Sequence, residues 1–517
     1  MVRKIMWLCV TVLISQALIA QSDVHNARIK IDTDRVIGDI HEHIYGNFAE
    51  HLGRCIYGGI YDPDFANTTE EGFRKDVLEA AKGLNVSLLR WPGGNFVSGY
   101  HWQDGIGPKD ERPQRTDLAW RTPEPNTFGT DEFIEYCRAL GTEPYFAVNL
   151  GTGTLDEARR WVEYCNIESG PYYAELRKKF GHEKPHNVKY WSLGNEMDGW
   201  WQMGHKNATD YGKFAREAAK LMKWTDPSIK LIAAGSSNFY EGASPHDWNE
   251  TILDYLVEYV DYIALHLYVR NDDNNYYKFM ASPLEIEKRT DIVRGQIGAA
   301  LDKAGRDEPI YIAWDEYNVW YRARGGEDSR GRHALEEKYN LEDAVVIAQF
   351  LNAFLRNADI VKMANMAQLV NVIAPIFTNE TDLYHQTIYY PLQLFANNAF
   401  GKSLDAYVDV ATYDTEEFKD VPYLDVSVAY DEGQVVINVV NRHRDQAIET
   451  DIHSQTGQFA GMFEVYEVNG PDIKMRNTFD EEPIHTVQKP DIEVSGERFT
   501  YTFPPHSYTM IKGRIEQ

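Results

Sequence analysis

Short apolar runs typical of buried strands alternate with longer amphipathic runs typical of helices through most of this chain. Such alternation favours a parallel sheet covered by helices, and eight strand candidates are enough to close a barrel. An open doubly wound sheet is the alternative, but no Gly-x-Gly-x-x-Gly turn follows an early strand. The predicted barrel strands are 43–48, 86–90, 145–149, 188–193, 230–234, 262–267, 310–313 and 361–368.

Helical patterns lie between these runs, at 73–84, 131–140, 155–165, 211–224, 248–260, 284–304 and 341–357. After about Pro391 the pattern changes to short strands separated by turn residues, which is typical of an antiparallel β-sandwich. The predicted fold class is therefore α/β, a (β/α)₈ TIM barrel with a C-terminal antiparallel, jelly-roll-like β-sandwich. The predicted divisions are a signal peptide (1–21), N-terminal strands that join the sandwich (22–40), the barrel (41–390) and the sandwich (391–517).

The first twenty residues have the pattern of a signal peptide. Arg3 and Lys4 precede an apolar run over 5–20, with the small residues Ala17 and Ala20 near a possible cleavage site. The run is too short to span a membrane comfortably, and no later stretch is long enough to cross one. We therefore expect export, to the periplasm or the medium.

Charge limits the partners of the chain. It has 79 acidic and 52 basic residues, a formal net charge of -27. Long-range repulsion then opposes binding to nucleic acid or to anionic membranes, whereas neutral substrates remain compatible. The three cysteines after the predicted signal, Cys55, Cys137 and Cys165, are an odd set without a Cys-x-x-Cys pair, so buried free thiols are expected.

Two acidic residues stand at the ends of predicted barrel strands, where such enzymes place catalytic groups. Strand four ends at Glu196 and strand seven at Glu316, roughly opposite each other in an eight-stranded ring. Glycoside hydrolysis needs such a pair, one carboxyl to protonate the leaving oxygen and one to attack or to activate water. Asp198 and Asp315 are alternatives, because strand alternation should send only one of Asp315 and Glu316 toward the barrel axis.

Other polar residues gather at the same strand ends. Arg90 ends strand two, His266 and Tyr268 close strand six, Glu50 follows strand one and Gln368 ends strand eight. The block after Arg90 carries two glycines, which let the backbone approach a ligand closely. Polar side chains at six of eight strand ends favour a polyhydroxylated substrate.

Metal binding is the rival use for such groups. His41, His43, Glu50 and His51 cluster around strand one, but their spacing is not His-Glu-x-x-His and offers no clear third ligand. The acidic run 271–275 lacks the glycine and the terminal glutamate of a calcium loop. The sequence therefore predicts neither a metal nor a cofactor.

Four blocks resemble glycoside hydrolase family 51, the α-L-arabinofuranosidases. They are IYGNFAEHLGR at 44–54, RWPGGNF at 90–96, LGNEMDG at 193–199 and DEYNVW at 315–320, and the match runs from strand one to the sandwich. Two departures occur: Tyr317 stands where relatives usually carry Trp, and Trp200 where many carry Pro. Both are expected to alter the walls that contact the leaving group.

The resemblance implies a retaining, exo-acting α-L-arabinofuranosidase that acts on arabinan, arabinoxylan or their oligosaccharides. Glu196 would be the acid/base, holding a proton near neutral pH, and Glu316 the nucleophile. An endoglucanase or β-xylosidase on the same fold, or a non-catalytic carbohydrate-binding protein, are the alternatives. A homo-oligomer, a hexamer by analogy with relatives, is expected. The residues expected at the substrate are Glu50, Asn95, Asn195 and Gln368 for hydroxyl groups, Tyr268 and Arg90 for the nucleophile, Trp320 for the wall, and His266.

Overall fold

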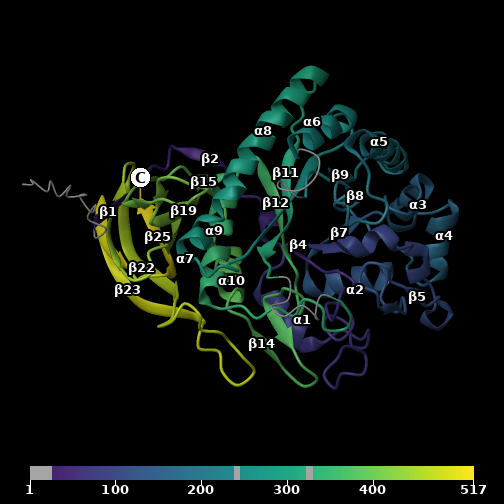
Figure 1. The fold of residues 1–517 in the computed structure, drawn as a ribbon, viewed down its shortest axis with the longest axis horizontal. Helices are drawn as coiled ribbons and strands as arrows, with labels where there is room; N and C mark the ends of the chain where they lie inside the picture. Colours follow the sequence, from purple (N-terminus) through teal and green to yellow (C-terminus); the bar gives the residue numbers. More distant parts are fainter. Residues whose placement is uncertain (1–25, 238–244, 322–329, 517) are drawn as a thin grey trace, which may run out of the picture.

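The computed structural model describes residues 26–237, 245–321 and 330–516, and eight parallel strands close into a barrel within it (Figure 1). The predicted (β/α)₈ barrel is therefore confirmed, with each predicted strand run at a barrel strand. Around the ring the strands are β3 (Gly46–Phe48), β4 (Leu88–Trp91), β7 (Glu143–Ala147), β8 (Tyr190–Leu193), β9 (Lys230–Ala233), β10 (Tyr262–Val269), β11 (Tyr311–Val319) and β12 (Val361–Ala367).

The helices wrap the barrel in chain order, and their ends follow from local capping. Asn340 and Asp343 exchange side-chain-to-backbone hydrogen bonds at the start of α9, and Gly305, with a φ of 64°, ends α8. The helices are α1 (Lys75–Gly83), α2 (Thr130–Leu140), α3 (Leu155–Asn166), α4 (Tyr172–Lys179), α5 (Ala208–Thr225), α6 (Pro245–Leu256), α7 (Tyr276–Ala281), α8 (Leu284–Ala304), α9 (Leu341–Arg356) and α10 (Tyr389–Asn398).

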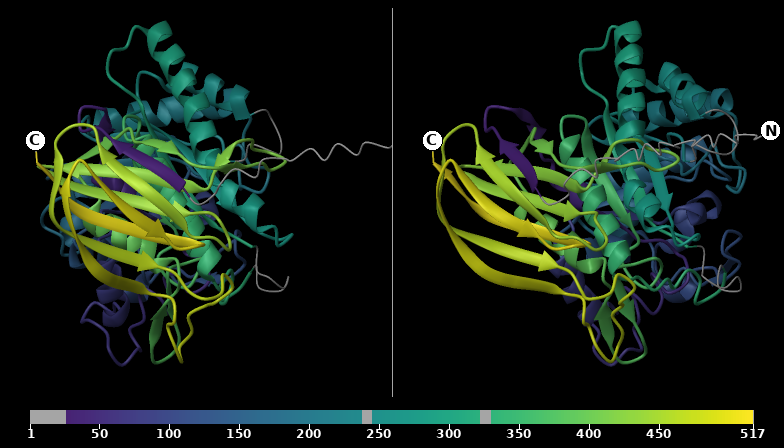
Figure 2. Two further views of the ribbon diagram at one scale, coloured as in Figure 1. Left: turned by 90° about the vertical axis from the view of Figure 1, so that its left-hand side faces the viewer. Right: turned by 60° about the vertical axis from the view of Figure 1, so that its left-hand side comes forward.

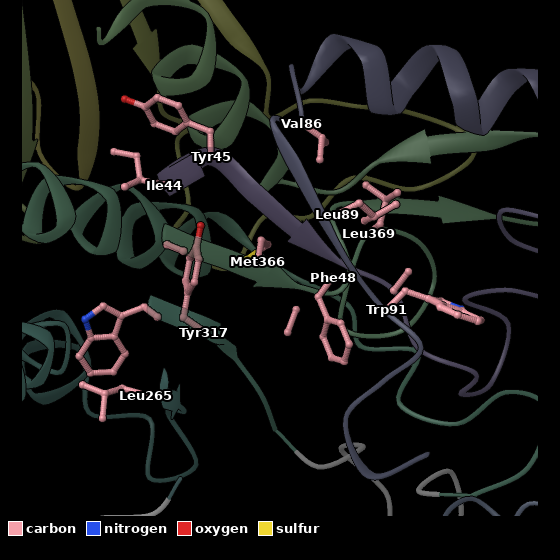
Figure 3. Close-up of a cluster of buried hydrophobic side chains, with 14 of the residues drawn as sticks. Ile44, Tyr45, Phe48, Val86, Leu89, Trp91, Leu265, Tyr317, Met366 and Leu369 are labelled. Carbon is pink, nitrogen blue, oxygen red and sulfur yellow. The ribbon is translucent and has the colours of Figure 1, made fainter. Parts of the chain in front are cut away.

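The outward faces of the barrel strands build the main core against these helices (Figure 3). Trp91 on β4 stacks on Phe133 of α2 with ring centroids 5.0 Å apart. Tyr317 on β11 is fully buried between the barrel and α9, with its ring 4.9 Å from that of Phe354. The expectation that Tyr317 alters a wall of the site is therefore wrong, because its side chain faces the helix layer.

Inside the barrel a separate apolar layer closes the lower part of the ring. It is built by residues that point toward the axis, among them Leu88, Tyr145, Tyr190, Ile232 and Met363. Because this layer fills the interior, any polar cavity must lie above it, at the carboxyl ends of the strands.

The remaining strands form a sandwich of two sheets at the left of Figure 1, seen from other sides in Figure 2. The larger sheet is antiparallel and runs β2 (Val36–Asp39), β15 (Lys402–Leu404), β19 (Leu424–Asp431), β20 (Gln434–Asn441), β25 (Ser507–Glu516), β22 (Gln458–Val468) and β23 (Thr486–Gly496). The smaller runs β16 (Tyr407–Asp409), β1 (Asn26–Ile31), β21 (Ile448–Ser454) and β24 (Arg498–Phe503). One pair, β1 with β21, is parallel, because β1 arrives from the distant N-terminal segment rather than through a hairpin. In the described part of the chain, six two- or three-residue strands pair outside these sheets: β5 (Arg115–Thr116) with β6 (Pro123–Glu124), β13 (Ile376–Thr378) with β14 (Leu383–His385), and β17 (Thr412–Tyr413) with β18 (Val421–Pro422).

Helix α9 joins the two parts through a buried charge cluster. The Asp425 carboxylate on β19 accepts from Asn352 Nδ2 at 2.8 Å and contacts Arg356 and Arg442 at 2.9 and 3.0 Å. Burial alone raises the pKa of Asp425, but the two guanidinium groups outweigh it and hold the pKa below its usual value. The ionised aspartate therefore stabilises the contact between α9 and the sandwich.

Replacing Asp425 with Ala should destabilise the fold by about 3–5 kcal/mol, because it leaves two arginines without their shared counter-charge. The loss would be measured as a shift of the urea unfolding midpoint. Since the folded pKa is depressed, the stabilisation is present above about pH 4 and is lost as the pH falls through the folded value. The difference between the variant and the parent should therefore shrink in acid. Asp409→Ala, at an exposed ion pair with Arg28, is the matched control and should cost less than about 1 kcal/mol; equal losses would contradict the assignment.

Candidate active site

Two consecutive carboxylates of β11 point into the barrel. The register between β11 and β12 shifts between Trp314 and Tyr317, and this irregularity turns both Asp315 and Glu316 toward the axis. Both side chains are buried and both contact Arg90. The expectation that alternation admits only one of them is therefore wrong, because a bulge suspends the two-residue repeat of a strand.

Arg90 stands at the centre of the site. Its guanidinium contacts Glu316 Oε1 at 2.7 Å, Asn195 Oδ1 at 2.5 Å and Asp315 Oδ2 at 3.3 Å, and it lies 4.6 Å from the centre of the Phe48 ring. Burial alone lowers the pKa of Arg90, but the two carboxylates outweigh it and raise that pKa. One fixed cation therefore balances and orients groups from three strands.

His266 bridges the three carboxyl groups. Its Nε2 lies 3.0 Å from Asp315 Oδ1, and its Nδ1 lies 2.8 Å from Glu196 Oε1 and 3.4 Å from Glu316 Oε2. Burial alone lowers the pKa of His266, but Glu316, Asp315 and Glu196 outweigh it and raise the pKa well above its ordinary value. The surrounding acids therefore favour the protonated form of the His266 imidazole.

Glu196 follows β8 in the left-handed backbone region, with a φ of 44°, and its side chain is 13% exposed. Its carboxylate accepts from Trp201 Nε1 at 2.5 Å and contacts His266. Burial alone raises the pKa of Glu196, but His266 and Trp201 lower it below its usual value. These contacts favour the carboxylate form of Glu196 in the substrate-free site, whereas the expected role as acid needs a proton on it.

Asp198, the alternative to Glu196, is turned elsewhere. Its carboxylate accepts from the backbone N–H and the hydroxyl of Ser237, at 2.9 and 2.7 Å. Burial raises the pKa of Asp198 to about 6. It therefore anchors the loop after β8.

A third acidic group, Glu50, lies beside the pair. It accepts from Phe96 N at 2.9 Å, Trp120 Nε1 at 3.0 Å and Gln368 Nε2 at 3.2 Å. Burial is the larger influence and raises the pKa of Glu50 to about 8. A Cβ added at Gly94 would lie 2.6 Å from Glu50 Oε2, so that glycine makes room for this carboxyl group.

The other predicted residues lie around this cluster. Tyr268 donates to Glu316 Oε2 at 2.8 Å, and its ring packs edge-on against half-buried Trp320 at 5.2 Å. Asn195 Nδ2 is buried and has no hydrogen-bond partner among the described residues. Asn95 begins the short 3-10 helix η2 (Asn95–Gly99), next to the backbone N–H that binds Glu50. The structure thus gathers the predicted residues at one end of the barrel.

The sequence reasoning missed three donors. Tyr145 donates to Asp315 Oδ2 at 2.9 Å, Trp201 binds Glu196, and Trp120 binds Glu50. The position of Trp201, five residues after Glu196, was the one available signal. Trp120 comes from an irregular loop, where Asp117 accepts from Ala119 N and Trp120 N, and no motif marks it.

The histidines considered as metal ligands do not share a site. His41 and His43 precede β3, whereas Glu50 and His51 follow it. Burial lowers the pKa of His43 to about 3, and its ring packs on Tyr190. His51 instead pairs with Glu124 at 2.9 Å.

The spacing of the acidic pair defines the class of the protein. One carboxylate oxygen each from Glu196 and Glu316 and a nitrogen of His266 lie within 4.8 Å of one another. A barrel that carries two carboxyl groups so close at its carboxyl end has the arrangement of a glycoside hydrolase with retention of configuration, because inverting enzymes need a wider gap of about 6.5–9.5 Å for water.

Comparison with known proteins specifies the family. Residues 80–283 match the model of the alpha-L-arabinofuranosidase 1 domain, and residues 315–507 match that of the alpha-L-arabinofuranosidase C-terminal domain. An intracellular exo-alpha-(1->5)-L-arabinofuranosidase of Bacillus subtilis is 41% identical, over 94% of this chain and 98% of the relative. Among solved structures, an alpha-L-arabinofuranosidase of Thermotoga maritima superposes with a TM-score of 0.86 at 41% identity, covering 95% and 100% of the two chains. A family 51 enzyme of Bifidobacterium longum reaches 0.89 at 34% identity, covering 94% and 99%. The chain belongs to glycoside hydrolase family 51, the α-L-arabinofuranosidases. An endoglucanase, a β-xylosidase and a non-catalytic binding protein are not favoured.

The expected export is corrected by the same relatives. Those from Bacillus subtilis, Halalkalibacterium halodurans and Acetivibrio thermocellus are all named intracellular. The predicted signal peptide lies outside the described residues. Cys55, Cys137 and Cys165 are buried free thiols, as expected. In the described part of the chain, no helix is both long and apolar enough to cross a membrane.

Replacing Asp315 with Asn keeps the shape but removes a negative charge 3.0 Å from His266. The pKa of His266 should then fall, because one of the charges that raise it is gone. We expect the alkaline limb of the kcat/KM profile to move about one unit to lower pH. An unchanged alkaline limb, in a variant with a parental melting temperature, would contradict this role of Asp315.

Proposed function

We propose that the chain removes terminal α-L-arabinofuranosyl residues from arabinan, arabinoxylan or their oligosaccharides, through a covalent glycosyl–enzyme. Glu316 is the nucleophile and Glu196 the acid/base. The observation that carries these roles is the contact set of the two residues. Among the described residues, Glu316 accepts hydrogen bonds from Arg90 and Tyr268, which suit a carboxylate. Glu196 is hydrogen-bonded to the imidazole of His266 at 2.8 Å, whereas Glu316 lies farther from that ring, at 3.4 Å.

In the first step Glu316 attacks the anomeric carbon while the leaving oxygen takes a proton from Glu196. That proton is stored on His266 Nδ1 in the free site and reaches Glu196 along the 2.8 Å hydrogen bond. Donation to the leaving group then leaves Glu196 ionised and His266 neutral, with the charge of Glu316 removed by the new ester bond.

In the second step the same pair works in reverse. Glu196, now a carboxylate, takes a proton from water, and the water attacks the glycosyl–enzyme from the face that the leaving group vacated. The Glu196–His266 pair recovers its proton and Glu316 returns as a carboxylate. Arg90 stays charged throughout, because its pKa is raised by the surrounding acids.

The sugar is held by the polar groups beside the pair. The buried Asn195 Nδ2 is a donor without a partner among the described residues, and a sugar hydroxyl would satisfy it. Glu50 and Gln368 offer acceptors and a donor on the other side, with Asn95 next to them, and Trp320 forms part of the wall. These side chains recognise a small, polar ring rather than a long groove-bound chain.

We propose that residues 41–390 are the catalytic unit, that 391–517 with 22–40 form the sandwich unit, and that the chain assembles as a homo-oligomer, a hexamer by analogy. Light scattering coupled to size-exclusion chromatography tests the assembly.

The nucleophile is tested with Glu316→Ala and an aryl α-L-arabinofuranoside that carries a good leaving group. Activity should fall on the order of 10³-fold or more, because no covalent intermediate forms. Sodium azide should restore turnover and yield a glycosyl azide of inverted configuration, identified by NMR.

Glu196→Ala is the matched variant, since it removes the other carboxyl group of the pair. Azide should rescue this variant with retained configuration, because the glycosyl–Glu316 bond still forms and azide then opens it. Near-parental activity of Glu316→Ala, or the same azide product from both variants, would refute the assigned roles.

A further inference from the structure

Trp200 is a large apolar side chain that the fold leaves in solvent. It is 72% exposed on the loop between β8 and α5, four residues after Glu196. Its neighbour Trp201 binds the Glu196 carboxylate, and the two indole rings lie 5.9 Å apart, edge to face. The Trp201 ring therefore lies between the exposed Trp200 indole and the candidate acid/base, Glu196. Leaving an apolar ring in water forgoes the free energy that its burial would provide.

The loop that presents Trp200 is held in place at several points. The backbone N–H of Gly199 donates to Glu196 O at 2.8 Å, and that of Gln202 donates to Gly199 O at 3.0 Å. The side chains of Gln202 and Asp198 bind Ser98 and Ser237, on the loops after β4 and β9. The indole is thus fixed relative to the site, which lowers the entropy lost when a ligand packs on it.

A second loop, between β5 and β6, repeats this arrangement. Trp120 binds the Glu50 carboxylate, and two residues before it Leu118 is 65% exposed. At both places a tryptophan contacts a site carboxyl group while a nearby apolar side chain faces solvent. Exposed apolar side chains beside a polar site are typical of a ligand-binding surface.

The chemistry of the site says which part of a ligand reaches Trp200. The acid/base protonates the oxygen of the leaving group, so the leaving-group sugars extend from the Glu196 side of the cavity. That side carries Trp201 and then Trp200. The C–H face of a sugar ring packs well on the flat apolar face of an indole.

We propose that Trp200 is a binding platform for the leaving-group side of a neutral oligosaccharide, beyond the sugar joined to the scissile bond. This inference rests on the proposed function, because it takes Glu196 as the acid/base. Trp200 touches substrate but no reacting atom, so it supplies binding that is equal in the ground state and the transition state.

The test compares Trp200→Ala with the parent enzyme on α-1,5-linked arabinobiose, arabinotriose and arabinotetraose and on 4-nitrophenyl α-L-arabinofuranoside. The loss should grow with the length of the leaving group. For the tetraose we expect KM to rise about 10-fold relative to the aryl substrate, with kcat nearly constant, as for the loss of one aromatic contact. Trp200→Phe should recover most of the affinity, because it keeps a flat ring.

Trp224→Ala is the matched control. Trp224 is 75% exposed but lies at the C-terminal end of α5, the end of the helix that points away from the substrate side of the barrel. It should leave all four substrates unaffected. A loss in Trp200→Ala that is independent of substrate length, or that falls on kcat alone, overturns the platform, as does no loss at all. Failure of the parent enzyme to turn over the aryl arabinofuranoside would instead refute the proposed function.

Discussion

The buried guanidinium of Arg90 is the contact on which the rest of the site depends. It neutralises part of the charge of Asp315 and Glu316 and fixes the amide of Asn195 at the same time. Without a cation at this position, adjacent carboxylates in a closed barrel would not both remain ionised. The aromatic ring of Phe48 and the apolar layer below the site confine the guanidinium of Arg90 to this position. Because Arg90 is held in one geometry, the hydrogen bonds among the neighbouring side chains determine which of them is protonated.

The bulge in β11 is linked to the balance of charge around Arg90 and His266. A regular strand would turn one of Asp315 and Glu316 outward, toward the apolar helix layer, where an ionised side chain would have no partner. The bulge keeps both inward, with Asp315 within reach of His266 and Tyr145. Glu316 is the largest of the influences that raise the pKa of His266, and Asp315 adds to it through its hydrogen bond to Nε2. Acid/base chemistry in this barrel depends on the Glu196–His266 pair rather than on Glu196 alone.

Most of the barrel was predictable because its strands are buried on both faces and read as apolar runs, and the four motif blocks fixed the candidate residues. The expectations that failed depend on local geometry that no pattern encodes. Alternation along β11 was broken by a bulge, Tyr317 faced α9, and Trp120 came from an irregular loop held by Asp117. The pKa of Glu196 could not be predicted either, because its direction depends on which nitrogen of His266 lies 2.8 Å away. Export was inferred from the basic and apolar pattern of residues 1–21, and relatives named intracellular overturn that inference.

The charge cluster at Asp425 gives the sandwich a part in aligning the catalytic strand. Helix α9 packs on β11 through Phe354 and is anchored to β19 by Asn352 and Arg356. The sandwich therefore stabilises the position of α9 and, through it, of the strand that carries Glu316. If the sandwich is exchanged between barrels, by recombination or by engineering, the new pair must preserve the face of α9 that contacts β19. The need to keep the nucleophile Glu316 in place thus limits which sandwich modules can accompany this barrel.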